Sequence, residues 1–347
     1  PMWSGNPIAG AVGRYAQPGW GGRMPTTFLG PAPQVTPPSG DRPVTVAVLD
    51  SPVAPHPWLP ETVVDRAPTV GGIPVGDHGL LGASVVDNAL LRQLGSHSGH
   101  GTFIAGLIRQ ACPEAHLVSV PVFGRDGVAS EFEVLEALAL LVVRQLRARR
   151  GLEDREVDVV SMSLGYYHEA PEDADYSIML ASRLRALGML GIAVVTSAGN
   201  DATVRPAFPA ALAPHDRVPT ERDVVPVVTV GATNPDGTSA LFSNDGPWVT
   251  TWRVGVGLVS AFPLVDAGQA PDVSAVSPFG MTRAALDPDD YTRGFAIWSG
   301  TSFAAPVYAA EVAAALGSAG VKAHEDVGSI VTRTWEIVAA TTNLERP

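Results

Sequence analysis

Five nearly continuous apolar runs constrain the fold of this chain more than any other feature of its sequence. They are VTVAVLD, LVSVPVF, VDVVSMSL, IAVVTSA and VVPVVTV, at residues 44–50, 117–123, 157–164, 192–198 and 224–230. Short runs without polar alternation are typical of strands buried on both faces of a parallel sheet. Helical patterns at 131–150 and 174–190 lie between them. This order predicts an α/β fold with a doubly wound, mostly parallel sheet and helices on both faces.

The sequence before the first run has a different composition. Residues 1–43 are dense in proline and glycine and hold too little apolar surface to offset their own ordering entropy. We predict an arm there, either flexible or laid over the rest. Residues 44–347 are predicted to form one domain, which ends in a helical tail at 325–342.

Composition and charge exclude several classes of protein. The 347 residues are 46% hydrophobic, which is enough to fill a large core. Thirty-five acidic and 23 basic residues give a net charge of −12, and no Lys/Arg cluster is present to bind nucleic acid. No apolar stretch of about 18 residues predicts a membrane span. Cys112 is the single cysteine, so an internal disulfide and a cysteine-based zinc site are excluded.

The ends of three apolar runs carry polar and glycine residues. These are Asp50 after the first run, Ser163, Leu164 and Gly165 at the third, and Ser197, Ala198, Gly199 and Asn200 at the fourth. In an open parallel sheet, ligands bind beyond the carboxyl ends of the strands. We therefore expect these residues to face one crevice.

Two further segments place a polar residue at the start of a helical pattern, His100 in one and Ser302 in the other. A helix N-terminus offers unpaired N–H groups and partial positive charge, which favour a developing anion. If the Ser302 hydroxyl attacks a carbonyl, its own N–H can donate to the resulting oxyanion. His100 would serve as the base, Asp50 would orient it, and the Asn200 amide would be the second donor.

Five motifs in this order resemble those of the subtilisin-like serine peptidases, the subtilases. They are VLDSPV at 48–53, HGTFIAG at 100–106, SLG at 163–165, AGN at 198–200 and GTSFAAP at 300–306. The order Asp, His, Asn, Ser is also that of the family. The resemblance extends from about Val44 to Leu316.

The resemblance implies a serine endopeptidase that hydrolyses polypeptides through an acyl-enzyme without an organic cofactor. Ser302 resembles the nucleophile, His100 the general base and acid, Asp50 its buried partner, and Asn200 the side-chain oxyanion donor. The remaining matches resemble substrate-binding segments: Ser163, Leu164 and Gly165 would pair with the substrate as an added strand, and Ser197, Ala198 and Gly199 would line the opposite wall.

The chain also departs from the family pattern. Pro52 stands where the family usually has glycine, and proline fixes φ and lacks an N–H beside Asp50. Phe303 replaces a common methionine, and Val307 stands where histidine often follows the proline. Between Phe262 and Phe295 the chain carries extra residues, which we expect to shape or cover the cleft.

The sequence locates no metal site. His97 and His100 are three residues apart, but no third ligand and no HExxH motif accompany them. Asp287, Asp289 and Asp290 offer carboxylates suited to calcium, yet the spacing of a known calcium loop is missing, so a solvated turn is the better interpretation. The family often binds calcium as a structural ion, and this sequence gives that ion no position.

Substrate preference stays open between two readings. Asp201, next to Asn200, favours a cationic substrate side chain, whereas Tyr166 and Tyr167 favour an apolar one. The alternative function is that of a catalytically inactive relative that keeps the cleft as a peptide-binding module. A nucleotide-binding protein is excluded because no G-x-G-x-x-G or Walker loop follows the first run. We expect a cytoplasmic location, with secretion after loss of a signal and propeptide as the alternative.

Overall fold

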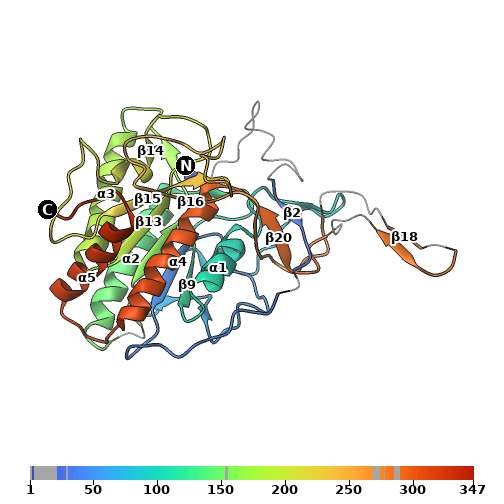
Figure 1. The fold of residues 1–347 in the computed structure, drawn as a ribbon, viewed down its shortest axis with the longest axis horizontal. Helices are drawn as coiled ribbons and strands as arrows, with labels where there is room; N and C mark the ends of the chain where they lie inside the picture. The colour runs from blue at the N-terminus through green and yellow to red at the C-terminus, as the bar shows by residue number, and fades with distance from the viewer. Residues whose placement is uncertain are drawn as a thin grey trace.

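A computed structural model of the chain describes residues 2–3, 22–28, 30–152, 155–268, 274–276, 278–284 and 290–347. Its centre is a seven-stranded sheet in which every neighbouring pair is parallel (Figure 1). The strand order is β16 (Thr251–Val254), β15 (Val227–Thr233), β13 (Ala193–Ser197), β11 (Val159–Met162), β3 (Thr45–Asp50), β9 (His116–Pro121) and β4 (Val64–Asp65). Each of the five inner strands overlaps one of the five apolar runs, and the α/β prediction is confirmed.

Five α-helices of the described chain cover the two faces of this sheet. One face carries α1 (His100–Ala111), α4 (Thr301–Ala319) and α5 (Val327–Thr341), and the other carries α2 (Glu131–Ala148) and α3 (Asp173–Met189) (Figure 1). Each helix layer shares a separate apolar core with its face of the sheet. The inner strands are buried on both sides, which explains why their sequences show no polar alternation.

The sheet reverses its direction of growth at β3. From β3 the chain crosses through α1 to β9 on one side, then through α2 to β11 on the other side of β3. Because such crossovers are right-handed, opposite directions of travel place α1 and α2 on opposite faces. The reversal opens a crevice at the carboxyl end of β3, and Asp50 is the last residue of that strand.

Local signals in the sequence fix the helix ends. Ser130 precedes α2, and its hydroxyl accepts a hydrogen bond from the Glu133 N–H at 3.1 Å, while the Glu133 carboxylate accepts from the Ser130 N–H at 3.2 Å. This capping box satisfies two N–H groups that the helix itself cannot pair. Asp326 caps α5 in a similar way, through the Ser329 N–H at 3.0 Å.

A smaller antiparallel sheet joins the arm to the domain. It consists of β17 (Leu258–Ala261), β20 (Phe295–Trp298) and β2 (Met24–Pro25). A second piece of the arm, β1 (Met2–Trp3), pairs with β10 (Val128–Ala129). These described parts of residues 1–43 are therefore laid over the domain.

The extra residues between Phe262 and Phe295 include a two-stranded hairpin, β18 (Ser274–Val276) and β19 (Thr282–Ala284). In Figure 1 this hairpin extends away from the helices and the central sheet. Residues 269–273 and 285–289 of the same stretch lie outside the described chain. The remaining short elements are β5 (Thr69–Val70), β6 (Ile73–Pro74), η2 (His78–Leu80), β7 (Val86–Asn88), β8 (Gln93–Leu94), β12 (Tyr166–Tyr167), β14 (Ala207–Phe208) and η3 (Ala210–Leu212).

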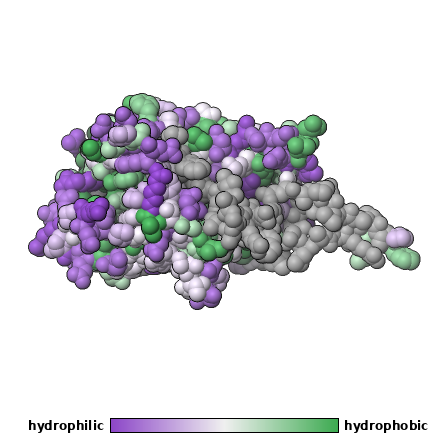
Figure 2. All heavy atoms as spheres, turned by 90° about the horizontal axis from the view of Figure 1, so that it is seen from above, coloured by the Kyte–Doolittle hydropathy of each residue, from purple (hydrophilic) through white to green (hydrophobic). Residues whose placement is uncertain are grey.

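Figure 2 shows hydrophilic residues spread over the described part of one face, with apolar residues in small groups among them. None of the described helices is both long and apolar enough to cross a membrane.

His116, the first residue of β9, makes the stability of the fold depend on pH. Burial, reinforced by the charges of Arg155 and Arg144, lowers the pKa of His116 from 6.5 to about 4. The unfolded chain therefore binds more protons than the folded one between these values, and stability falls as the pH drops from about 6.5 toward 4.

We expect His116→Phe to reduce this acid sensitivity. In the wild type, protonation of residue 116 in the unfolded chain lowers the free energy of unfolding at pH 5 by about 2 kcal/mol. The variant lacks the imidazole and is not expected to lose this stability. Urea unfolding of both proteins at pH 7 and pH 5 measures the difference. Equal losses of unfolding free energy in the two proteins would contradict the expectation.

Candidate active site

Asp50 and His100 form a buried pair at the crevice. His100 is the first residue of α1, and its Nδ1 lies 2.8 Å from Oδ1 and 2.9 Å from Oδ2 of Asp50. Both side chains are almost completely shielded from solvent, with residue exposures of 1% for Asp50 and 2% for His100. Because a carboxylate only accepts, Nδ1 donates, and a neutral ring then carries its lone pair on Nε2.

The residues next to the pair hold it in place. The Ser51 N–H donates to Asp50 Oδ1 at 2.7 Å, and the Ser51 hydroxyl accepts from the Gly101 N–H at 2.9 Å. Gly101 has to be glycine, since a Cβ there would lie 2.0 Å from the Ser51 carbonyl oxygen. Pro52 takes no part in these contacts, so the departure at that position does not prevent Asp50 from reaching His100.

Ser302 occupies the second position of α4 and is 3% exposed. Its carbonyl oxygen accepts a hydrogen bond from the Ser163 hydroxyl at 2.9 Å, which ties α4 to the end of β11. The adjacent Phe303 ring lies 5.1 Å from the His100 ring. No hydrogen bond between His100 and Ser302 is present among the described residues. Catalytic contacts of this kind are often long in a free enzyme and shorten when substrate binds.

Asn200 lies across from the start of α4, and its amide orientation is fixed. Its Oδ1 accepts from both the N–H and the hydroxyl of Thr301, each at 2.8 Å. The Thr301 hydroxyl in turn accepts from the Gly199 N–H at 3.2 Å. Since two donors bind the same atom, that atom is the amide oxygen, and the other atom of the amide is the nitrogen, which donates.

Asn200 and Ser302 line one small cavity of about 20 Å³, room for roughly one water molecule. Four predicted substrate-binding residues line it with them: Leu164, Gly165, Ser197 and Gly199. Ser163 and Ala198 do not. Ser163 binds the Ser302 carbonyl instead, and the Ala198 carbonyl accepts from the Asn244 side chain at 3.0 Å.

Asn244 is a residue whose role the sequence did not indicate. It is fully buried, and its Oδ1 accepts from the N–H groups of Asp201 at 3.0 Å and Thr203 at 3.2 Å. Its Nδ2 donates to Ala198, as described, and to the Tyr167 hydroxyl at 2.7 Å. Asn244 thus holds the loop that carries Asn200. Asn244 stands 44 residues after Asn200, and although Phe242, Ser243 and Asn244 resemble a loop of the family, that resemblance gave no indication of this contact.

Both readings of substrate preference concern this same cavity. Asp201, Tyr166 and Tyr167 all line it. The Tyr167 hydroxyl donates to Asp201 Oδ2 at 2.8 Å, so the carboxylate already has a partner. Burial raises the pKa of Tyr166 to about 12, and its hydroxyl lies 2.5 Å from Ser177 Oγ. The two tyrosines also border a larger hollow of about 410 Å³ that extends toward Val128.

The metal candidates do not form a cluster in the described chain. Asp287 and Asp289 lie outside the described residues. Asp290 Oδ1 accepts from the N–H of Thr292 at 2.8 Å and from its hydroxyl at 2.5 Å. Within the described ranges, no group of three His, Cys, Asp or Glu side chains is placed to hold an ion.

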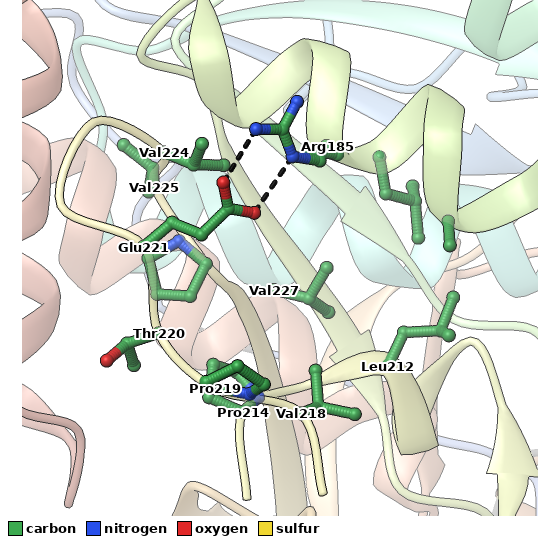
Figure 3. Close-up of a pocket in the computed structure, with 13 residues that line it drawn as sticks. Arg185, Leu212, Pro214, Val218, Pro219, Thr220, Glu221, Val224, Val225 and Val227 are labelled. Carbon is green, nitrogen blue, oxygen red and sulfur yellow. Dashed lines mark hydrogen bonds and ion pairs between the residues drawn. The ribbon is translucent and has the colours of Figure 1, made fainter.

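A second pocket lies elsewhere in the fold, between α3 and the segment before β15 (Figure 3). Its volume is about 160 Å³, and Arg185 and Glu221 form an ion pair at its edge, with N–O distances of 2.8 and 2.6 Å. Val227, the first residue of β15, is part of its wall. The pocket therefore borders the amino end of β15, whereas Asp50 and Ser197 lie at the carboxyl ends of β3 and β13. Because these strands are parallel, the pocket and the candidate site lie at opposite edges of the sheet.

Known proteins with similar sequences fall in one family. The model of the subtilase family matches residues 41–343. Subtilisin-like protease 2 of Pseudogymnoascus destructans is 30% identical over 169 residues, which cover 48% of this chain and 36% of that protein. Serine protease AprX of Bacillus subtilis is 27% identical over 221 residues, which cover 59% and 43%. The chain thus spans about two fifths of the length of these relatives.

A solved structure supports the fold. The crystal structure of a lanthipeptide protease superposes with a TM-score of 0.55 at 19% identity, over 80% of this chain and 73% of the other. At this identity the likeness concerns the arrangement of strands and helices.

Proposed function

Because the chain belongs to the subtilase family, we propose that it is a serine endopeptidase that cleaves polypeptides through an acyl-enzyme. The observation that carries the proposal is the buried Asp50 and His100 pair, in which His100 Nδ1 lies 2.8 and 2.9 Å from the two carboxylate oxygens. The ring of Phe303, the residue after Ser302, lies 5.1 Å from the His100 ring. A buried imidazole bound to a carboxylate is a suitable base for a neighbouring hydroxyl.

The proposed reaction follows from these groups. His100 Nε2 takes the Ser302 hydroxyl proton as the oxygen attacks the scissile carbonyl carbon. The same proton then passes from Nε2 to the amide nitrogen, the C–N bond breaks, and the amine product leaves. A water molecule repeats the sequence on the acyl-enzyme and releases the acid product. Asp50 stabilises the imidazolium in both halves, so side chains and water suffice and no organic cofactor takes part.

The oxyanion formed in each half needs donors. We assign this role to the Ser302 N–H at the start of α4 and to Asn200 Nδ2. The assignment of Nδ2 is supported by Thr301, whose N–H and hydroxyl both donate to Oδ1 of the same amide. The substrate chain would lie between Leu164 and Gly165 on one side and Ser197 and Gly199 on the other, as these residues line the same cavity as Ser302.

Cleavage of an unfolded protein tests the proposal against the binding-module alternative. The enzyme is expected to generate new peptide termini, which mass spectrometry identifies, and the Ser302→Ala variant is expected to generate none. A protein that binds the same peptides but leaves them intact would support the peptide-binding module instead.

Asn200→Leu provides a separate test of the oxyanion role. We expect kcat to fall by roughly 10²- to 10³-fold with little change in KM, because the donor acts on charge that develops only in the transition state. The control is Asn234→Leu, which removes an amide that donates to the Thr238 hydroxyl at 3.0 Å in a turn after β15. A comparable fall in kcat in both variants, or a fall confined to KM, would rule out the role assigned to Asn200.

A further inference from the structure

A short part of the N-terminal arm, residues 22–28, lies against the site and is called the strap here. Its Met24 and Pro25 pair with Ile297 and Ala296 of β20, and the Thr26 N–H donates to the Phe295 carbonyl at 3.1 Å. The strap precedes residues 41–343, the range that matches the family model. The strap therefore lies outside the matched range, and it contacts residues within that range.

Arg23 is a buried strap residue, 6% exposed. Its Nη1 donates to the Ser98 carbonyl at 2.8 Å and lies 3.4 Å from the Ser96 carbonyl, and its Nη2 donates to the Gly95 carbonyl at 3.0 Å. Within the described chain no carboxylate forms an ion pair with Arg23. The two terminal nitrogens of the guanidinium thus bind three backbone carbonyls of one loop.

That loop, residues 95–99, leads directly into α1, the helix that begins with His100. The His100 N–H donates to the His97 carbonyl at 3.1 Å, and Gly99 takes a left-handed conformation with φ of 77° just before α1 begins. A Cβ on Gly99 would lie 2.5 Å from the Phe262 ring, so the turn fits closely against its neighbours. The backbone position of His100 therefore depends on how the loop is held.

Arg23 also supports the rings around His100. Its guanidinium carbon lies 5.0 Å from the centre of the Trp298 ring and 5.5 Å from that of Phe262. Trp298 in turn meets the His100 ring edge-on, with centres 5.5 Å apart at 88°. One side chain from the strap thus contacts both the loop before His100 and the aromatic wall beside it.

We propose that Arg23 is a positioning residue for His100: it holds the loop and the Trp298 ring so that the imidazole keeps the orientation in which Nδ1 binds Asp50. The inference rests on the proposed peptidase function. Loss of the guanidinium would leave the Ser96 and Ser98 carbonyls without this buried donor and free the loop to shift. A displacement of about 1 Å at a catalytic group costs up to roughly 10²-fold in rate.

The experiment compares Arg23→Met with a matched control, Arg109→Met. Arg109 is also buried, and it also donates to backbone carbonyls, those of Pro113 and, at 3.2 Å, Pro33. It lies nine residues after His100 on α1, about 13 Å along the helix axis. Both variants are expected to lose stability, which thermal unfolding measures.

Only Arg23→Met is expected to lower kcat, by roughly 10- to 100-fold with KM within a few-fold of wild type. Arg23→Lys keeps the charge and some donors and is expected to recover part of kcat. It also serves as the test variant if Arg23→Met does not fold. An equal kcat in the Arg23 and Arg109 variants would overturn the inference, as would a loss in KM alone.

A proton NMR measurement separates this inference from the proposed function. The His100 Nδ1 proton, bonded to Asp50, gives a low-field resonance whether or not the protein cleaves peptides. We expect the resonance to shift or broaden in Arg23→Met and to stay unchanged in Arg109→Met. If the wild type fails to cleave peptides, the proposed function falls while this comparison still decides whether Arg23 positions His100. An unchanged resonance in Arg23→Met would refute the positioning role.

Discussion

Replacing Ser302 with alanine is expected to lower peptide turnover by roughly 10⁶-fold, the cost of removing the serine from a triad that acts as a unit. The hydroxyl oxygen is the atom that forms the acyl-enzyme, and alanine offers no nucleophile in its place. Turnover of a fluorogenic peptide by purified wild type and variant measures the ratio.

The fold should tolerate this change. Among the described residues, the Ser302 hydroxyl forms no hydrogen bond, so alanine is expected to alter the unfolding free energy by less than about 1 kcal/mol. Ser299→Ala is the control, since its hydroxyl accepts from the Gly257 N–H at 3.0 Å three residues earlier. Substantial activity in Ser302→Ala, or a loss as large in Ser299→Ala, would disprove the role of Ser302 as nucleophile.

Asp50→Asn is expected to lower kcat by roughly 10⁴-fold. Asp50 presents two acceptor oxygens, and Oδ1 accepts from both His100 Nδ1 and the Ser51 N–H. An amide has only one oxygen. With the Ser51 N–H bound to that oxygen, the amide nitrogen takes the position of Oδ2, which lies 2.9 Å from His100 Nδ1, and a donor there favours the tautomer protonated at Nε2. That tautomer cannot accept the Ser302 proton.

Asp158→Asn offers a matched control at the opposite end of β3, where Asp158, just before β11, binds the first residue of β3. Asp158 is also buried, and it accepts from the Thr45 N–H at 2.8 Å and from both terminal nitrogens of Arg42 at 2.7 Å. Its replacement is expected to reduce stability and to leave kcat within a few-fold of wild type. If Asp50→Asn were to behave like Asp158→Asn, Asp50 would be a structural residue only.

Much of the central fold could be predicted because local patterns determine it. The five inner strands follow from continuous apolar runs, and α2 follows from a helical pattern that begins with acids after Ser130. The edge strands β4 and β16 were not predicted. Their sequences, VD and TWRV, are half polar and show no continuous apolar run, and they form because a longer neighbour offers unpaired backbone groups.

The site could be predicted in part, for a different reason. Asp50, His100, Asn200 and Ser302 stand at element ends within motifs, so the sequence itself marks them. Arg23 stands in a proline- and glycine-rich arm with no motif, and its contacts join residues more than 70 positions apart. Its contact with the 95–99 loop depends on tertiary packing, so the sequence alone could not predict it.

Labelling with a fluorophosphonate tests the central claim most directly, because the probe reacts with a serine only where a base and an oxyanion site activate it. We predict a single adduct on the peptide that contains Ser302 in the wild type, no adduct in Ser302→Ala, and a strongly reduced one in His100→Ala. A wild type that stays unlabelled, or an adduct on another residue, would contradict the account.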